Sequence, residues 1–170
     1  MAEERPVITL LTDFGTSDSY VAQMKGMLLR ACRDAVIVDI SHEIQPQDIM
    51  GAAVVIADAY SRFPRETIHV VVVDPGVGSE RRIICLSADR HIFLAPDNGV
   101  LELVLRSHKA EALVEVTSEW YFAHGVSDTF HGRDIFASVA GHLATGTRLC
   151  LLYTSPSPRD LSTPRMPSSA

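Results

Sequence analysis

The chain has 170 residues, 46% of them hydrophobic, so it is long enough to bury one sizeable core and is expected to form one domain. Its 15 Lys and Arg residues are outnumbered by 21 Asp and Glu residues, and the formal net charge is −6. This balance leaves no basic stripe for a phosphate backbone, which disfavours a nucleic-acid partner and favours a small-molecule ligand.

Two further features bear on the compartment. No run of residues approaches the roughly 20 apolar positions of a membrane span, and the first five residues are too polar and acidic for a secretory signal. The three cysteines, Cys32, Cys85 and Cys150, are widely separated and odd in number. That usage favours reduced thiols over a disulfide framework or a zinc site, so we expect a cytoplasmic protein with no membrane partner.

The first 75 residues predict strands alternating with helices. Apolar runs at residues 7–11, 35–40 and 70–73 have the composition of buried strands, and the Val-rich third run belongs at the centre of a sheet. Between them, apolar residues recur at helical spacing over residues 20–30 and 47–62. Ser17, Asp18 and Ser19 offer capping oxygens for the first helix. This order is typical of a parallel sheet with right-handed crossovers.

The next part of the chain predicts a hairpin from residues 83–87 and 91–95, a short helix at 100–107 and another strand at 112–116. Residues 117–127 contain the only tryptophan and predict a loop that either covers a site or packs against a partner. Thr129 can cap a final helix with His131 in its first turn. The expected fold is α/β, with three layers and a mostly parallel central sheet covered by helices on both faces.

The last part of the sequence differs in character. Residues 155–170 contain four of the nine prolines and five serines, without periodicity. This stretch resembles the peptide obtained when adapter or vector DNA is translated. We therefore expect a domain over residues 1–148, followed at 149–170 by a disordered Pro- and Ser-rich tail that is a non-native scar.

Candidate site residues follow two of the predicted strands. Asp13 and Asp74 each come directly after a strand and before a glycine turn, at the sheet edge where α/β proteins bind ligands. Arg81 or Arg82 and His131 can join them. A carboxylate, a guanidinium and an imidazole together can orient a water molecule and stabilise the charge that develops as it attacks. The pattern suggests a hydrolytic or transfer reaction. A surface ion pair between the aspartate and the arginine, and a structural histidine, are the alternatives.

Other catalytic signatures are weak. The sequence has no Walker A motif, no G-x-S-x-G and no H-E-x-x-H, and its single G-x-G at residues 76–78 lacks the rest of a phosphate-binding motif. His124, His131 and Asp134 could bind a divalent cation, so metal-dependent hydrolysis stays an alternative.

Six short motifs give the chain a family resemblance: T-D-F-G at 12–15, S-Y-V-A-Q-M-K-G at 19–26, D-I-S-H-E-I at 39–44, V-D-P-G-V-G at 73–78, A-P-D-N-G at 95–99 and T-F-H-G-R-D-I-F at 129–136. In this order they resemble the S-adenosylmethionine hydroxide adenosyltransferases, relatives of the enzymes that make 5'-fluoro- and 5'-chloroadenosine. The resemblance implies hydrolysis of S-adenosylmethionine to adenosine and methionine, by in-line attack of water on C5'.

The resemblance also implies roles for individual residues. It makes Asp74, Arg81 and His131 the catalytic group that holds the water, with Arg82 as the alternative arginine. Asp13 would bind the ribose hydroxyls. We also expect Gln47 and Gly132 to contact the substrate. It implies no metal and no cofactor besides the substrate, and retention of the charged group favours water over a halide as nucleophile.

The resemblance covers only the first domain of the family's members. The family's members resemble homotrimers and continue into a smaller β-rich domain, which we expect to be missing from this chain. Two hypotheses therefore stay open: the chain is an active hydrolase, or it is a nucleoside-binding module without catalysis.

Overall fold

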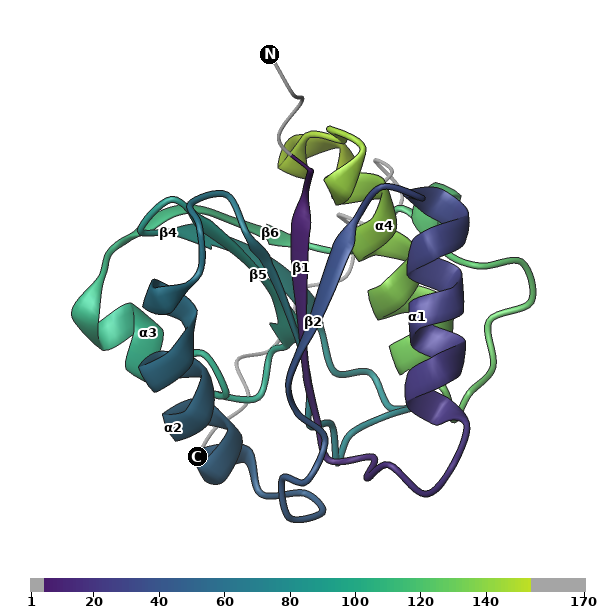
Figure 1. Ribbon diagram of the computed structural model, residues 1–170, viewed down its shortest axis with the longest axis horizontal. Helices are drawn as coiled ribbons and strands as arrows, with labels where there is room; N and C mark the ends of the chain where they lie inside the picture. The colour runs from purple at the N-terminus through teal and green to yellow at the C-terminus, as the bar shows by residue number, and fades with distance from the viewer. Residues whose placement is uncertain (1–4, 154–170) are drawn as a thin grey trace, which may run out of the picture.

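A computed structural model describes residues 5–153, which form a six-stranded sheet between two layers of helices (Figure 1). The strand order is β2-β1-β3-β5-β4-β6. Strand β4 is antiparallel to both of its neighbours, and the other pairs are parallel. The expected three-layer α/β fold with a mostly parallel sheet is therefore confirmed. The strands are β1 (Val7–Thr12), β2 (Val36–Ser41), β3 (Ile68–Val72), β4 (Ile83–Ala88), β5 (His91–Pro96) and β6 (Ala110–Glu115).

The helices divide between the two faces of the sheet. Helices α1 (Tyr20–Ala31) and α4 (Ser138–Ala144) cover one face, and α2 (Ile49–Ala59) and α3 (Glu102–Ser107) cover the other (Figure 1). Each face has its own apolar core. Short helical segments complete the structure: η1 (Tyr60–Arg62), η2 (Glu119–Tyr121), η3 (Gly132–Ala137), which is π-helical, and η4 (Leu149–Leu152).

Strand β3 lies at the centre of the sheet, and all of its residues are buried. This burial on both faces explains why its sequence has no polar alternation. In the pairing of β1 with β3, Thr12 is opposite Val72. The two strands therefore end side by side, and the chain leaves the sheet close to Asp13 and Asp74.

Helix starts differ from the sequence expectations. Ser19 occupies the N-cap position of α1, but its hydroxyl accepts a hydrogen bond from the Gln23 side chain and caps no backbone amide. Helix α2 begins at Ile49 and not near 47, because Asp48 accepts the Gly51 N–H and acts as its cap. The expected cap at Thr129 is wrong, since η3 begins at Gly132, has His131 at its N-cap position and has no side-chain cap.

The start of the expected tail belongs to the folded part. Residues Leu149–Leu152 form η4, and Leu152 is fully buried. The Leu152 carbonyl accepts the backbone N–H groups of Thr117 and Ser118, so the segment is fixed to the chain after β6. Leu152, and in part Leu149, gain burial against the core, although Cys150 and Leu151 of the same apolar run stay exposed. The Pro and Ser content of the following residues obscured this signal. Residues 154–170, the rest of the expected tail, lie outside the described part.

The three cysteines carry free thiols, as expected. Cys85 is fully buried in β4, and burial raises the pKa of its thiol to about 12. That thiol is therefore not a nucleophile at neutral pH. Within residues 5–153, none of the helices has the length and apolar content needed to cross a bilayer.

A buried histidine pair in the sheet gives a first prediction. Thr9 pairs with His69 Nδ1 at 2.7 Å, and His69 Nε2 pairs with His91 Nδ1 at 3.0 Å. Burial, and then the neighbouring His91, lower the pKa of His69 to about 3. The unfolded chain binds this proton near pH 6.5, so the free energy of unfolding is expected to fall as the pH drops from 6.5 towards 3. Between these pH values, a proton that the unfolded chain binds and the folded chain does not lowers the free energy of unfolding by about 1.4 kcal/mol per pH unit.

Urea unfolding at pH 7, 6 and 5 measures this dependence. The variant His69→Gln keeps a hydrogen-bonding group beside Thr9 but does not titrate, so its stability should depend less on pH in this range. An equal pH dependence in wild type and variant would contradict the assignment.

Candidate functional site

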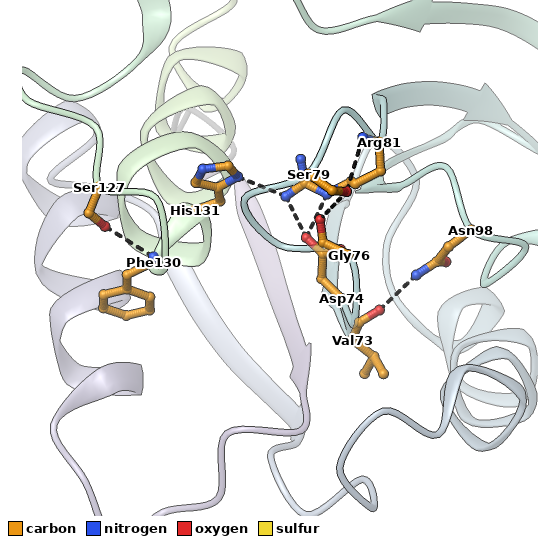
Figure 2. A network of polar contacts seen from close by, with 9 residues as sticks. All are labelled: Val73, Asp74, Gly76, Ser79, Arg81, Asn98, Ser127, Phe130 and His131. Atoms are coloured by element: carbon orange, nitrogen blue, oxygen red, sulfur yellow. Dashed lines mark hydrogen bonds and ion pairs between the residues drawn. The ribbon is translucent and has the colours of Figure 1, made fainter.

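Three charged or polar side chains from distant parts of the chain meet beyond the carboxyl ends of the central strands (Figure 2). Arg81 donates from Nε and Nη2 to Asp74 Oδ2, at 2.7 and 2.5 Å. The same Nη2 lies 2.8 Å from His131 Nδ1. Asp74 follows β3, Arg81 precedes β4 and His131 precedes η3. The structure thus brings together the three residues that the sequence analysis grouped as catalytic.

The turn between Asp74 and Arg81 is shaped by local bonds. Ser79 Oγ donates to the Gly76 carbonyl at 2.6 Å and accepts the Arg81 N–H at 3.3 Å (Figure 2). Gly78 has a φ of +77°, and a Cβ there would lie 2.7 Å from the Asp128 carbonyl oxygen. Only glycine fits both demands. These contacts direct Arg81 back towards the end of β3.

The choice between two neighbouring arginines is settled by their partners. Arg82 pairs with Asp97 on the surface, and its side chain is 57% exposed. Arg81 pairs with Asp74, and its side chain is 12% exposed. Arg81 is therefore the arginine of the site, and Arg82 forms an ordinary exposed ion pair of small energetic value.

The electrostatics of the site determine which atoms are free to act. Burial, and then the nearby Arg81 guanidinium, lower the pKa of His131 below its usual value, so its imidazole is neutral at pH 7. A guanidinium can only donate, so His131 Nδ1 accepts and the ring proton sits on Nε2. Asp74 is 5% exposed, and its Oδ1 has no hydrogen-bond partner among the described residues. That oxygen is a buried acceptor available to a ligand or water.

The predicted substrate-binding residues lie beside this group. Asp13, Asp74, His131 and Gly132 help to line one cavity of about 50 Å³. Asp13 Oδ2 accepts the backbone N–H of Gln47 at 2.8 Å. Gln47 thus reaches the site through its backbone N–H, which fixes Asp13. The φ angle of Gln47 is +68°. The ring of Phe14 packs so closely against Gly132 that a Cβ there would lie 3.0 Å from the ring.

The metal alternative is not supported by the geometry. Both Asp134 oxygens are engaged by Arg133, and Oδ2 also accepts the Ser127 N–H. Residues 5–153 contain no group of three or more His, Cys, Asp or Glu side chains that could hold a metal ion. The suggested site at His124, His131 and Asp134 is therefore wrong, because Asp134 serves the protein's own structure.

Sequence reasoning missed several parts of the site. Ser79 shapes the turn between Asp74 and Arg81, and Asn98 Nδ2 donates to the Val73 carbonyl at 2.9 Å, which fixes the end of β3 (Figure 2). Their only sequence signal is their place in turn-forming stretches. The loop around Trp120 lines a second, larger cavity of about 880 Å³, which reaches His131. Trp120 itself is 86% exposed.

Fold and site together define an α/β domain whose sheet edge holds a carboxylate with a free acceptor oxygen, joined through a guanidinium to a neutral imidazole. The family model of the S-adenosylmethionine hydroxide adenosyltransferase N-terminal domain matches residues 8–152. The chain belongs to this family.

Individual relatives agree with this assignment. An (R)-S-adenosyl-L-methionine hydrolase from Salinispora arenicola is 40% identical over 145 residues, which are 85% of this chain and 55% of that protein. A fluorinase from Nocardia brasiliensis is 31% identical, over 84% of this chain and 55% of that protein. The crystal structure of an uncharacterized conserved protein from Thermotoga maritima matches with a TM-score of 0.83 and 39% identity, over 85% of this chain and 56% of that one. The chain spans a little over half the length of these relatives.

Proposed function

We propose that this chain carries the water-handling half of an enzyme that hydrolyses S-adenosyl-L-methionine to adenosine and L-methionine. The observation that carries the proposal is the Asp74–Arg81–His131 contact, which leaves Asp74 Oδ1 as a buried acceptor. The naming of relatives as (R)-S-adenosyl-L-methionine hydrolases supports the choice of substrate.

The reaction needs little more than a well-placed water. The water oxygen forms a bond to C5' while the C5'–S bond breaks. The electron pair of the broken bond stays on sulfur, which leaves as the neutral thioether of methionine. The water's proton passes to Asp74 or to solvent. Because a sulfonium is already a good leaving group, we propose that alignment and removal of solvent suffice, without a metal or a cofactor.

Each residue then has a distinct task. Asp74 Oδ1 accepts a hydrogen bond from the water, and Arg81 holds Asp74 through Oδ2. His131 fixes the guanidinium by accepting at Nδ1. Asp13 accepts from the ribose hydroxyls, while Gln47 steadies it and Gly132 lets the neighbouring aromatic ring approach.

The charge of the site favours water over a halide. A fluoride or chloride ion placed beside Asp74 Oδ1 would meet a buried negative charge, whereas water can donate to it. The fluorinase relatives share the family, and this carboxylate is the reason to place the chain with the hydrolases.

The cavity size indicates that the described residues do not complete the substrate site. The cavity lined by Asp13 and Asp74 holds about 50 Å³, while pockets for small-molecule ligands occupy roughly 300–1,000 Å³. The larger cavity of about 880 Å³ reaches His131 but is lined by neither of these two carboxylates. We therefore propose that the adenine and methionine contacts come from outside the described residues, in a homotrimer as the family resemblance implies. The free cysteines support a reducing, cytoplasmic location.

The proposal is tested by incubating the protein with S-adenosylmethionine and measuring adenosine by chromatography. Adenosine above the blank supports it, and an unchanged yield with a chelator supports the metal-free mechanism. Calorimetry with adenosine and S-adenosylmethionine separates the alternatives, since binding without turnover indicates a nucleoside-binding module. If the protein shows no binding and no turnover, both hypotheses are contradicted.

The two adjacent arginines give a matched prediction. Arg81→Lys keeps the charge but cannot bridge Asp74 and His131 from a planar fork, so we expect about a 10- to 100-fold loss of kcat. Arg82→Lys, at the exposed ion pair with Asp97, is expected to change kcat less than about twofold. Initial rates of adenosine formation measure both, and equal effects of the two changes would contradict the assignment of Arg81.

A further inference from the structure

The segment 123–131, which carries His131 into the site, has both its ends bound to a single residue. The Asp134 carbonyl accepts the Ala123 N–H at 2.8 Å, and the Asp134 N–H donates to the Phe130 carbonyl at 3.1 Å. Residues 123–130 of this segment contain no helix or strand. Its position therefore depends on these contacts with the first turn of η3.

The side chain of Asp134 fixes the middle of the same segment. Asp134 Oδ2 accepts the Ser127 N–H at 2.9 Å. Figure 2 shows the next bond, in which Ser127 Oγ accepts the Phe130 N–H at 3.0 Å. The Asp134 side chain is 3% exposed, so its carboxylate is withdrawn from water. Such a buried acceptor is costly to leave without its donors, which keeps the segment in place.

The buried charge of Asp134 has its own counterion. Arg133 donates from Nε to Oδ1 at 2.5 Å and from Nη2 to Oδ2 at 3.0 Å. Burial alone would raise the pKa of Asp134, but the hydrogen bonds from Arg133 and Ser127 hold it below its usual value. Arg133 Nη1 also donates to the Gln23 side chain, which connects the group to α1. The carboxylate is thus charged and firmly held at neutral pH.

Asp134 lies in the first turn of the π-helical η3, whose N-cap is His131. A π-helix has a wider turn than an α-helix, and single π-turns are frequent at functional sites. Because His131 is the residue that precedes η3, any shift of the segment 123–131 also moves its imidazole.

We propose that Asp134 is a positioning residue for His131, whose buried carboxylate fixes the segment 123–131 so that the imidazole reaches Arg81. The importance of this contact for hydrolysis rests on the proposed function. The contact itself can be tested without any turnover.

The test follows the titration and tautomer of His131 by long-range ¹H–¹⁵N NMR. In the wild type we expect an unprotonated Nδ1 and a pKa below about 6.5. In Asp134→Ala the segment loses its anchor, so water reaches the ring. The pKa of His131 should then rise towards about 6.5, and the Nδ1–H tautomer should appear.

The direction of this shift separates positioning from simple charge loss. A nearby carboxylate stabilises the imidazolium, so removing its charge alone would lower the pKa of His131. The other charged or titratable groups that face His131 are Arg81, Asp74 and Asp128, with Glu119 and His124 on the wall of the larger cavity. Asp128→Asn is the matched control: it removes an exposed carboxylate near His131 and is expected to lower the pKa.

Three outcomes would overturn the proposal. One is an Asp134→Ala protein, folded by circular dichroism, in which the His131 tautomer is unchanged and the pKa does not rise. A second is a rise in Asp128→Asn as large as that in Asp134→Ala. If Asp134→Ala does not fold, Ser127→Ala is the second variant, because it removes the oxygen that accepts the Phe130 N–H. It should shift the titration of His131 in the same direction, by a smaller amount. The third outcome is the absence of any shift in Ser127→Ala.

Discussion

Replacing Asp74 with asparagine is expected to lower kcat for adenosine formation from S-adenosylmethionine by about 10²- to 10⁴-fold, the range that a positioned acid–base group contributes. Asparagine keeps the size of the side chain but loses the charge that pairs with Arg81 and part of its capacity to accept from water. Binding of adenosine should change little, because the ribose contact is assigned to Asp13.

The surface ion pair on the same sheet edge gives the control. Asp97→Asn removes a carboxylate that also pairs with an arginine, Arg82, but in an exposed position. Its kcat should stay within about twofold of wild type. Circular dichroism checks that the Asp74 variant is folded, because its buried guanidinium loses its counterion. Equal adenosine yields from Asp74→Asn and wild type would reject the assignment of the water to Asp74.

Phe136→Ala is expected to lower the free energy of unfolding by about 3–5 kcal/mol. Phe136 is fully buried between the helices and the sheet, and the Arg81 guanidinium carbon lies 6.0 Å from the centre of its ring. The change leaves a cavity in the core and removes the apolar surface beside Arg81. Such a loss is a large fraction of the stability of a typical domain.

Urea unfolding at 25 °C measures this loss. Trp120→Ala removes an aromatic side chain that is 86% exposed and should alter the free energy of unfolding by no more than about 0.5 kcal/mol. A cost of less than about 1 kcal/mol for Phe136→Ala would show that the core can collapse around the missing ring, which the close packing of η3 and α4 against the sheet does not favour.

The elements of the fold could be predicted because their signals are local. The Val-rich run of β3 and the helical spacing of α1 are visible within a dozen residues, and their alternation indicates a parallel sheet. The helix starts were harder to predict. Ser19, Asp48 and Thr129 all have side chains suited to capping, but of these only Asp48 receives a backbone amide at the start of its helix. Which candidate caps depends on how the chain enters the helix.

For the site, the sequence alone determined the types of residue present and the ordered motifs that place the chain in its family. Only the tertiary structure decided which arginine faces Asp74, which imidazole nitrogen is occupied, and that Asp134 holds a loop and not a metal. The reason is physical: periodicity and turn chemistry act between near neighbours, whereas Arg81 and His131 are 50 residues apart. Their contact exists because β3, η3 and the turn before β4 pack against one core, and no local pattern in the chain encodes that packing.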